Sequence, residues 1–96
     1  MSYRLILSEK ADSDSIGASI WYEQKAEGLG TKFKEVIGRK LRLIEQYPER
    51  YPIKKGNFRE TYVRTFPYLI IYKFYKRRKE IVVYSIFHSR RKYSGK

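Results

Sequence analysis

The chain has 96 residues, a hydrophobic fraction of 42% and an aromatic fraction of 17%, enough for one small core and too much for a disordered protein. With no cysteine and a single histidine, it excludes disulfides, iron–sulfur clusters and thiolate metal sites, and we expect no metal and no cofactor. The net charge is +12, unevenly spread: residues 1–48 hold eight bases and seven acids, whereas residues 49–96 hold fourteen bases and three acids.

The first elements follow from apolar patterning and a cap. Residues 3–7 form a short apolar segment that predicts a buried strand. Ser8 is a favourable helix N-cap, and residues 9–27 then predict a helix that Gly17 weakens locally. The large apolar residues of this helix fall near one stripe: Ile16, Ile20 and Trp21.

A second helix is expected after the break at residues 28–30, Gly-Leu-Gly. From about Thr31 the apolar residues recur at spacings of three and four, and Tyr47-Pro48 ends the pattern. Because the connection is short, the two helices should form an antiparallel hairpin. The sequence Gly-Leu-Gly-Thr-Lys lacks the spacing of a phosphate-binding loop and is interpreted as this helix–helix turn.

The second half is predicted to be strands. Residues 48–57 are rich in turn formers, after which residues 58–66 alternate with period two. Residues 68–75 and 80–87 are apolar and aromatic, and residues 76–79 form a charged hairpin tip between them. The predicted order is β-α-α-β-β-β, an α+β fold in which the helical hairpin packs on one face of an antiparallel-rich sheet. Residues 1–96 form a single domain; whether residues 92–96 are ordered is left open.

Candidate binding residues are arginines of the basic half. Arg59 and Arg64, five apart on one predicted strand, should point to opposite faces, so that one lies on the face without helices. An arginine on that face could be a packing and solubility residue, or it could bind a phosphate through two hydrogen bonds. Arg77 and Arg78, at the hairpin tip, are expected to contribute general attraction to phosphates.

The end of the last strand holds the densest chemistry. His88 could move protons, since histidine is the residue type suited to this at neutral pH; Arg90 could stabilise a phosphorane, and Tyr93 could act as an acid or base. These are parts for a metal-independent attack of a ribose 2′-hydroxyl on its phosphate. A basic tail including Arg91 and Lys92 explains the same residues equally well.

Seven short motifs follow one another over nearly the whole chain: S-x-x-A from Ser8, WYEQ at 21–24, GLGTKF at 28–33, P-x-x-Y-P at 48–52, FR at 58–59, RTFPYLIIY at 64–72 and IFHSRR at 86–91. In this order they resemble the RelE/ParE superfamily of toxins of bacterial type II toxin–antitoxin modules. The resemblance implies the element order above and a cytoplasmic protein bound by a cognate antitoxin. It implies no membrane and no small-molecule cofactor.

The resemblance is closer to the ParE and plasmid stabilisation branch, whose members inhibit DNA gyrase, than to the RelE branch, whose members cut mRNA on the ribosome. Arg64 and Arg90 match arginines of RelE-like enzymes, and Tyr93 could replace their C-terminal tyrosine. However, Glu60 and Tyr62 stand where those enzymes carry lysines, and a carboxylate repels RNA phosphates.

We therefore expect a toxin that arrests growth by binding its target through Arg59, Arg64, Arg77, Arg78, Arg90, Arg91 and Lys92. One alternative is an endoribonuclease that uses His88, Arg64, Arg90 and Tyr93. A further alternative is a non-toxic domain that binds a partner or nucleic acid.

Overall fold

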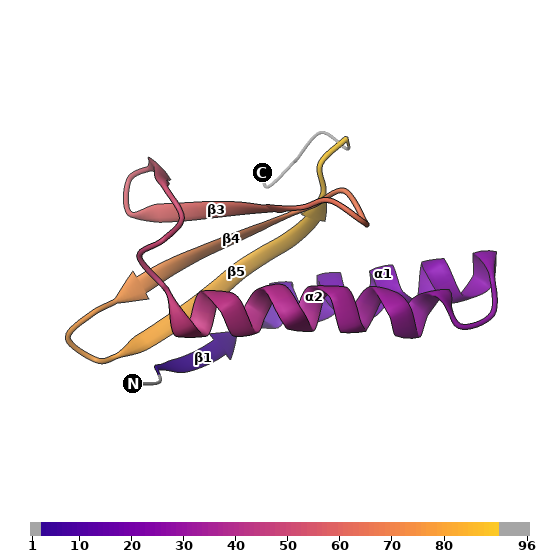
Figure 1. The fold of residues 1–96 in the computed structure, drawn as a ribbon, viewed down its shortest axis with the longest axis horizontal. Helices are drawn as coiled ribbons and strands as arrows, with labels where there is room; N and C mark the ends of the chain where they lie inside the picture. Colours follow the sequence, from indigo (N-terminus) through magenta and orange to yellow (C-terminus); the bar gives the residue numbers. More distant parts are fainter. Residues whose placement is uncertain (1–2, 91–96) are drawn as a thin grey trace.

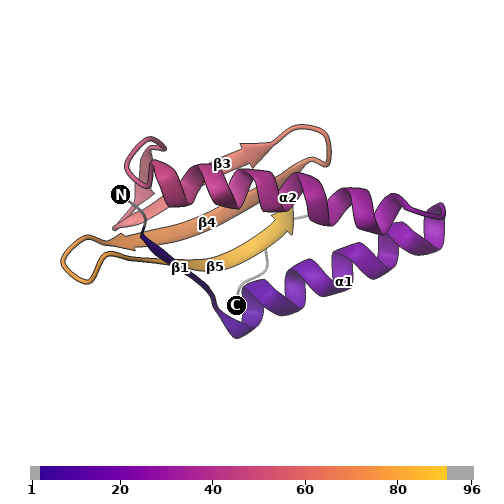
Figure 2. The ribbon, with the colours of Figure 1, turned by 60° about the horizontal axis from the view of Figure 1, so that its bottom comes forward.

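A computed structural model describes residues 3–90, and Arg91, Lys92 and Tyr93 lie outside the described residues. The elements follow the chain as β1 (Arg4–Leu7), α1 (Glu9–Lys25), α2 (Leu29–Gln46), β2 (Ile53–Lys55), β3 (Phe58–Val63), β4 (Tyr68–Tyr75) and β5 (Glu80–His88). The five strands form one sheet in the order β1-β5-β4-β3-β2. Only the β1–β5 pair is parallel, and both helices cover the same face of the sheet (Figures 1 and 2). The predicted α+β fold is confirmed.

Strand β2 is the one described element that the sequence did not predict. It is only three residues long, all three are exposed, and its pairing with β3 is irregular. A strand with both faces in water leaves no alternation of apolar and polar residues. The sequence therefore predicts only a turn for residues 48–57.

The core lies between α2 and the covered face of the sheet. Helix α2 buries Phe33, Val36, Ile37 and Ile44, because its apolar residues recur along one stripe. The sheet supplies fully buried residues of β4 and β5: Tyr68, Ile70, Tyr72, Ile81, Val83 and Ile86. The Tyr72 hydroxyl donates to the Pro48 carbonyl at 2.7 Å, which fastens the chain leaving α2 to the sheet.

Helix α1 has a side-chain cap at its start, and its outer side is exposed to solvent. The Ser8 side chain caps the helix by accepting from the Ala11 N–H at 3.0 Å, as predicted. The helix buries only Ala11 and Ser19, while the stripe of Ile16, Ile20 and Trp21 faces solvent. The closed end of the helical hairpin, where α1 meets α2, extends past the ends of the strands, so no strand covers it (Figure 1).

The turn between the helices is held by Glu23. Its carboxylate accepts from the N–H groups of Gly28 and Gly30, both at 2.9 Å, and these bonds lower the pKa of Glu23. Gly28 has φ 86° and is the N-cap of α2, whereas Ala26 in extended conformation caps α1. The turn between the helices therefore lies at residues 26–28 and not at the expected 28–30, since α2 already includes Leu29 and Gly30 and begins after the left-handed Gly28.

Candidate functional site

One end of the sheet gathers three of the predicted site residues. The register pairs Tyr68 with His88, and the Ser89 N–H donates to the Pro67 carbonyl at 2.7 Å. Arg64 lies in the turn between β3 and β4, directly before this pair, and Arg90 follows β5. Both arginines are exposed. The structure therefore brings Arg64, His88 and Arg90 to the same end.

Arg77 and Arg78 lie at the opposite end, in the turn between β4 and β5. Arg78 is already engaged, since its Nε lies 3.4 Å from Glu80 Oε1 and its guanidinium 4.5 Å from the centre of the Tyr75 ring. These two arginines cannot share a compact site with His88. The predicted set of binding residues therefore divides between two ends of the sheet.

Arg59 has a structural role. Its Nη1 donates to the Tyr51 carbonyl at 2.6 Å and to the Glu49 carbonyl at 3.3 Å, both in the loop that follows α2. The expectation that Arg59 or Arg64 lies on the strand face without helices is wrong. Arg59 points to the covered face, and Arg64 is beyond the strand because β3 ends at Val63.

His88 is positioned by a cluster of aromatic rings. The Tyr68 ring lies 5.4 Å from it in an edge-to-face arrangement, and Tyr22 and Phe33 pack against Tyr68 from the two helices. The Arg90 N–H donates to His88 Nδ1 at 3.1 Å. The imidazole is therefore held by both the strand and the residues that follow it.

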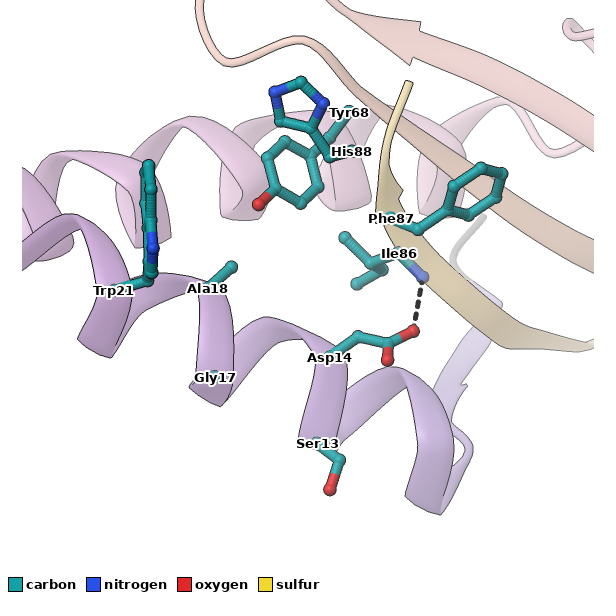
Figure 3. Close-up of a pocket in the computed structure, with 9 residues that line it drawn as sticks. All are labelled: Ser13, Asp14, Gly17, Ala18, Trp21, Tyr68, Ile86, Phe87 and His88. Carbon is teal, nitrogen blue, oxygen red and sulfur yellow. Dashed lines mark hydrogen bonds between the residues drawn. The ribbon is translucent and has the colours of Figure 1, made fainter. Parts of the chain in front are cut away.

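A cavity of about 280 Å³ lies between α1 and the end of β5. Figure 3 shows Trp21 on one side, Tyr68 and His88 above, Ile86 opposite Trp21, and the small residues Gly17 and Ala18 below. Asp14 closes it, with Oδ2 accepting from the Ile86 N–H at 3.1 Å and from Lys10 Nζ at 3.0 Å. The bond between Asp14 and Ile86 joins α1 to the strand that carries His88.

The sheet face without helices carries a second depression, of about 700 Å³, whose lining includes Phe58, Glu60, Ile71 and Tyr84. The Tyr84 hydroxyl is 2.8 Å from that of Tyr75, and this hydrogen bond raises the pKa of Tyr84. Lys10 and Lys55 line it as well. Glu60, the residue that stands where RelE-like enzymes carry lysine, thus faces the depression.

Sequence reasoning did not identify Asp14, Trp21 or Tyr84 as residues of a candidate site. Tyr84 lies on the open face by simple alternation with the buried Ile81 and Val83. A register shift in the pairing of β4 with β5, which pairs Ile71 with Ser85 but Tyr72 with Val83, brings Ser85 to the same depression. No sequence pattern marks such a shift. Trp21 could have been noted, since it is the one tryptophan and sits in the WYEQ motif.

Two negative findings apply to residues 3–90. No described helix is long and apolar enough to cross a membrane. Within the same residues, no cluster of three or more histidine and carboxylate side chains is arranged to hold a metal ion.

Comparison with known proteins identifies the family. No curated protein matches the chain. Solved structures share its fold: the chromosomal ParDE toxin–antitoxin system from P. aeruginosa has a TM-score of 0.75 at 18% identity, covering 90% of this chain and 95% of that one. A chain of the intact E. coli RelBE toxin–antitoxin complex has a TM-score of 0.62 at 15% identity, covering 93% and 99%. The isolated E. coli RelE toxin scores 0.61 at 15% identity, covering 94% and 87%.

The family model for the ParE toxin of the type II toxin–antitoxin system parDE matches residues 5–93. The match begins within β1 and includes the whole of α1, α2 and β2 to β5, and with them the His88 end of the sheet and the Glu23 turn. The chain therefore belongs to the ParE toxin family.

Proposed function

We propose that this ParE-family chain arrests growth by binding DNA gyrase in the cytoplasm, and that a cognate antitoxin neutralises it. The observation that carries the proposal is the grouping of Arg64, His88 and Arg90 at one end of the sheet in a chain of net charge +12. Such a surface attracts an acidic protein or a protein–DNA complex. The ParDE system solved from P. aeruginosa supports an antitoxin as the second partner.

The open sheet face argues for binding instead of RNA cleavage. Glu60 lines the depression there, and Tyr62 on the same strand is exposed. Glu9 lines the depression as well, so two carboxylates balance the charges of Lys10 and Lys55 there, and the lining offers a phosphate no excess of positive charge. In a nuclease, several cations would instead converge on the phosphate.

The experiment is induced expression without antitoxin, followed by a supercoiling assay with purified chain and gyrase. Wild-type chain should stop growth and inhibit supercoiling. Combined Arg64→Ala and Arg90→Ala substitutions should relieve both effects, whereas Arg77→Ala, an exposed arginine at the opposite end, should leave both unchanged. Normal growth on expression of intact wild-type chain would refute the proposal.

The second candidate function is a metal-independent mRNA endoribonuclease, favoured by the shared position of Arg64, His88 and Arg90. Tyr93, its fourth residue, lies outside the described residues. Primer extension on translated mRNA from the same induced cells decides between the two. New 5′ ends within codons that disappear in His88→Ala would establish cleavage and overturn the gyrase proposal.

A further inference from the structure

The cavity between α1 and the end of β5 has walls that suit a flat ring. Its volume of about 280 Å³ is near the lower end of the range for small-molecule sites, roughly 300–1,000 Å³. Figure 3 shows the Trp21 ring edge-on, with one face turned towards the cavity, and Tyr68 and His88 along a second side. Gly17 and Ala18, with little or no side chain, leave the space between them open. Aromatic walls around an open space favour a planar aromatic ligand.

The Trp21 ring is accessible and held in place. The residue is 45% exposed, so a ligand can cover apolar surface that otherwise faces water. The Tyr22 ring meets it edge-to-face at 5.0 Å, and Lys25 Nζ lies 4.7 Å from its centre. A fixed, accessible aromatic ring is the kind of surface on which nucleobases stack.

Asp14 supplies a hydrogen-bond acceptor at the edge of the cavity. Among the nine described residues that line the cavity, it is the one with a carboxylate. Its Oδ2 accepts from the Ile86 N–H and from Lys10 Nζ, whereas no hydrogen bond within residues 3–90 uses Oδ1. A carboxylate has acceptor sites on both oxygens, so it can still accept from an amino or imino group of a ligand.

Charge decides which planar ligand fits. Lys10 Nζ lies 3.0 Å from Asp14 Oδ2 and offsets its charge, so the cavity favours a neutral ring over an ammonium ion. Arg90 is exposed two residues after His88, and Arg64 lies at the same end of the sheet. Both attract an anionic group attached to the ring. A neutral heterocycle that carries N–H donors and a phosphate is a nucleotide, and a two-ring purine offers Trp21 more area for stacking than a pyrimidine does.

We propose that this cavity binds a purine nucleotide. The base stacks on Trp21 beside Tyr68 and His88, its amino or imino group donates to Asp14, and its phosphate approaches Arg90. Guanine is preferred, because its imino and amino donors are adjacent. A free mononucleotide and an unstacked base of a single strand share this chemistry. The proposal does not depend on gyrase as the target, because the site is formed by this chain alone.

Trp21 is the one tryptophan of the chain, so stacking on it can be followed as quenching of its fluorescence. GMP, guanosine and UMP are titrated into the purified chain, with correction for their absorbance. GMP should quench saturably, guanosine should bind more weakly because it lacks the phosphate, and the Kd of UMP should be about tenfold higher than that of GMP.

A short oligouridylate with one internal guanine, compared with the all-uridine oligomer, distinguishes the two sources of the base. If the guanine-containing strand binds more tightly than GMP, the ligand is a base within a strand. If GMP binds and neither strand does, the ligand is the free nucleotide.

Four substitutions locate the site, with calorimetry as the readout. Trp21→Leu should raise the Kd of GMP about tenfold, and Trp21→Phe, which keeps an aromatic ring, should recover much of the affinity. Ala18→Phe should abolish binding, because the larger side chain fills the cavity. Arg90→Ala should weaken GMP about fivefold and leave guanosine unchanged, since only GMP carries the phosphate. The matched control is Arg77→Ala, at the opposite end of the sheet, which should affect neither ligand.

The exposed Trp21 keeps the test decisive even if Ala18→Phe fails to fold, which circular dichroism would reveal. Quenching that does not saturate, equal affinities for GMP and UMP, or a Trp21→Leu chain that binds GMP as tightly as wild type would overturn the proposal. Equal losses of GMP binding in Arg90→Ala and Arg77→Ala would also overturn it, in favour of general attraction to the basic chain.

Discussion

Helices α1 and α2 have nearly equal lengths and form one hairpin, yet they use their apolar residues in opposite ways. Helix α2 turns Phe33, Ile37 and Ile44 into the core, each at most 2% exposed. Helix α1 leaves Ile16 and Ile20 more than half exposed and buries small residues instead. An apolar stripe therefore predicts a surface that excludes water, but it does not say whether the core or another protein covers that surface.

The largest expected contrast comes from truncating one residue on each helix. Phe33→Ala should lower the free energy of unfolding by about 3–5 kcal/mol, because Phe33 is fully buried against Tyr22, Phe66 and Tyr68. Ile20→Ala should change it by about 0.5 kcal/mol or less, since the side chain is half exposed. Urea unfolding followed by circular dichroism measures both. Equal losses would mean that the α1 stripe is part of the core.

The fold could be predicted from the sequence wherever a periodic pattern and its terminating signals agree. The segment 68–75 is rich in β-branched and aromatic residues and ends at a charged turn, and β4 has those bounds. Ser8 marked the start of α1, and Tyr47-Pro48 the end of α2. Strand β2 could not be predicted because its pairing depends on β3 and on no feature of its own three residues.

A smaller contrast involves two glycines. Gly30→Ala should cost about 1–3 kcal/mol, because an added Cβ would collide with the Ser19 carbonyl where the helices cross closely. Gly17→Ala should instead stabilise the chain by about 0.5–1 kcal/mol, because its position in α1 is open and alanine favours helix. Thermal or urea unfolding of the two variants gives the signs. If Gly17→Ala is destabilising, the added methyl group must meet a packed neighbour, which would contradict the open surface at this position of α1.

The candidate site was less predictable than the fold. Sequence reasoning brought His88 and Arg90 together because they are close in the chain. Arg64 lies at the same end of the sheet because of the register of β3, β4 and β5. Arg59 does not belong to this end, because its guanidinium donates to two carbonyl groups of the loop after α2. Every residue type carries a backbone carbonyl, so the sequence does not show which carbonyl groups an arginine side chain will bind.

A third contrast concerns how each helix is joined to the sheet: the chain leaving α2 accepts a hydrogen bond from the buried Tyr72 hydroxyl, whereas at the start of α1 the Ser8 hydroxyl donates to the Tyr84 carbonyl at 3.2 Å. Tyr72→Phe should cost about 1–2 kcal/mol, since it leaves the buried Pro48 carbonyl without its donor. Burial raises the pKa of Tyr72 from 10.0 to about 12. The unfolded chain ionises first, so the contribution is complete below pH 10 and is lost as pH rises towards 12. The stability difference between wild type and Tyr72→Phe should shrink across that window; a constant difference would contradict the assignment.

The smallest expected effect lies where the two helices meet. The N–H groups of Gly28 and Gly30 hold the pKa of Glu23 below its ordinary value of 4.5. The unfolded chain therefore takes up the proton first, and the stabilisation by Glu23 is present above pH 4.5 and lost as pH falls through the lower folded pKa. Glu23→Gln should reduce the urea midpoint slightly at neutral pH, and the gap between the two midpoints should narrow as the pH falls below 4.5. Glu27→Gln, exposed in the same turn, provides the matched control. A gap that persists in acid would mean that the amide geometry of the turn, and not the charge of Glu23, joins the buried helix to the exposed one.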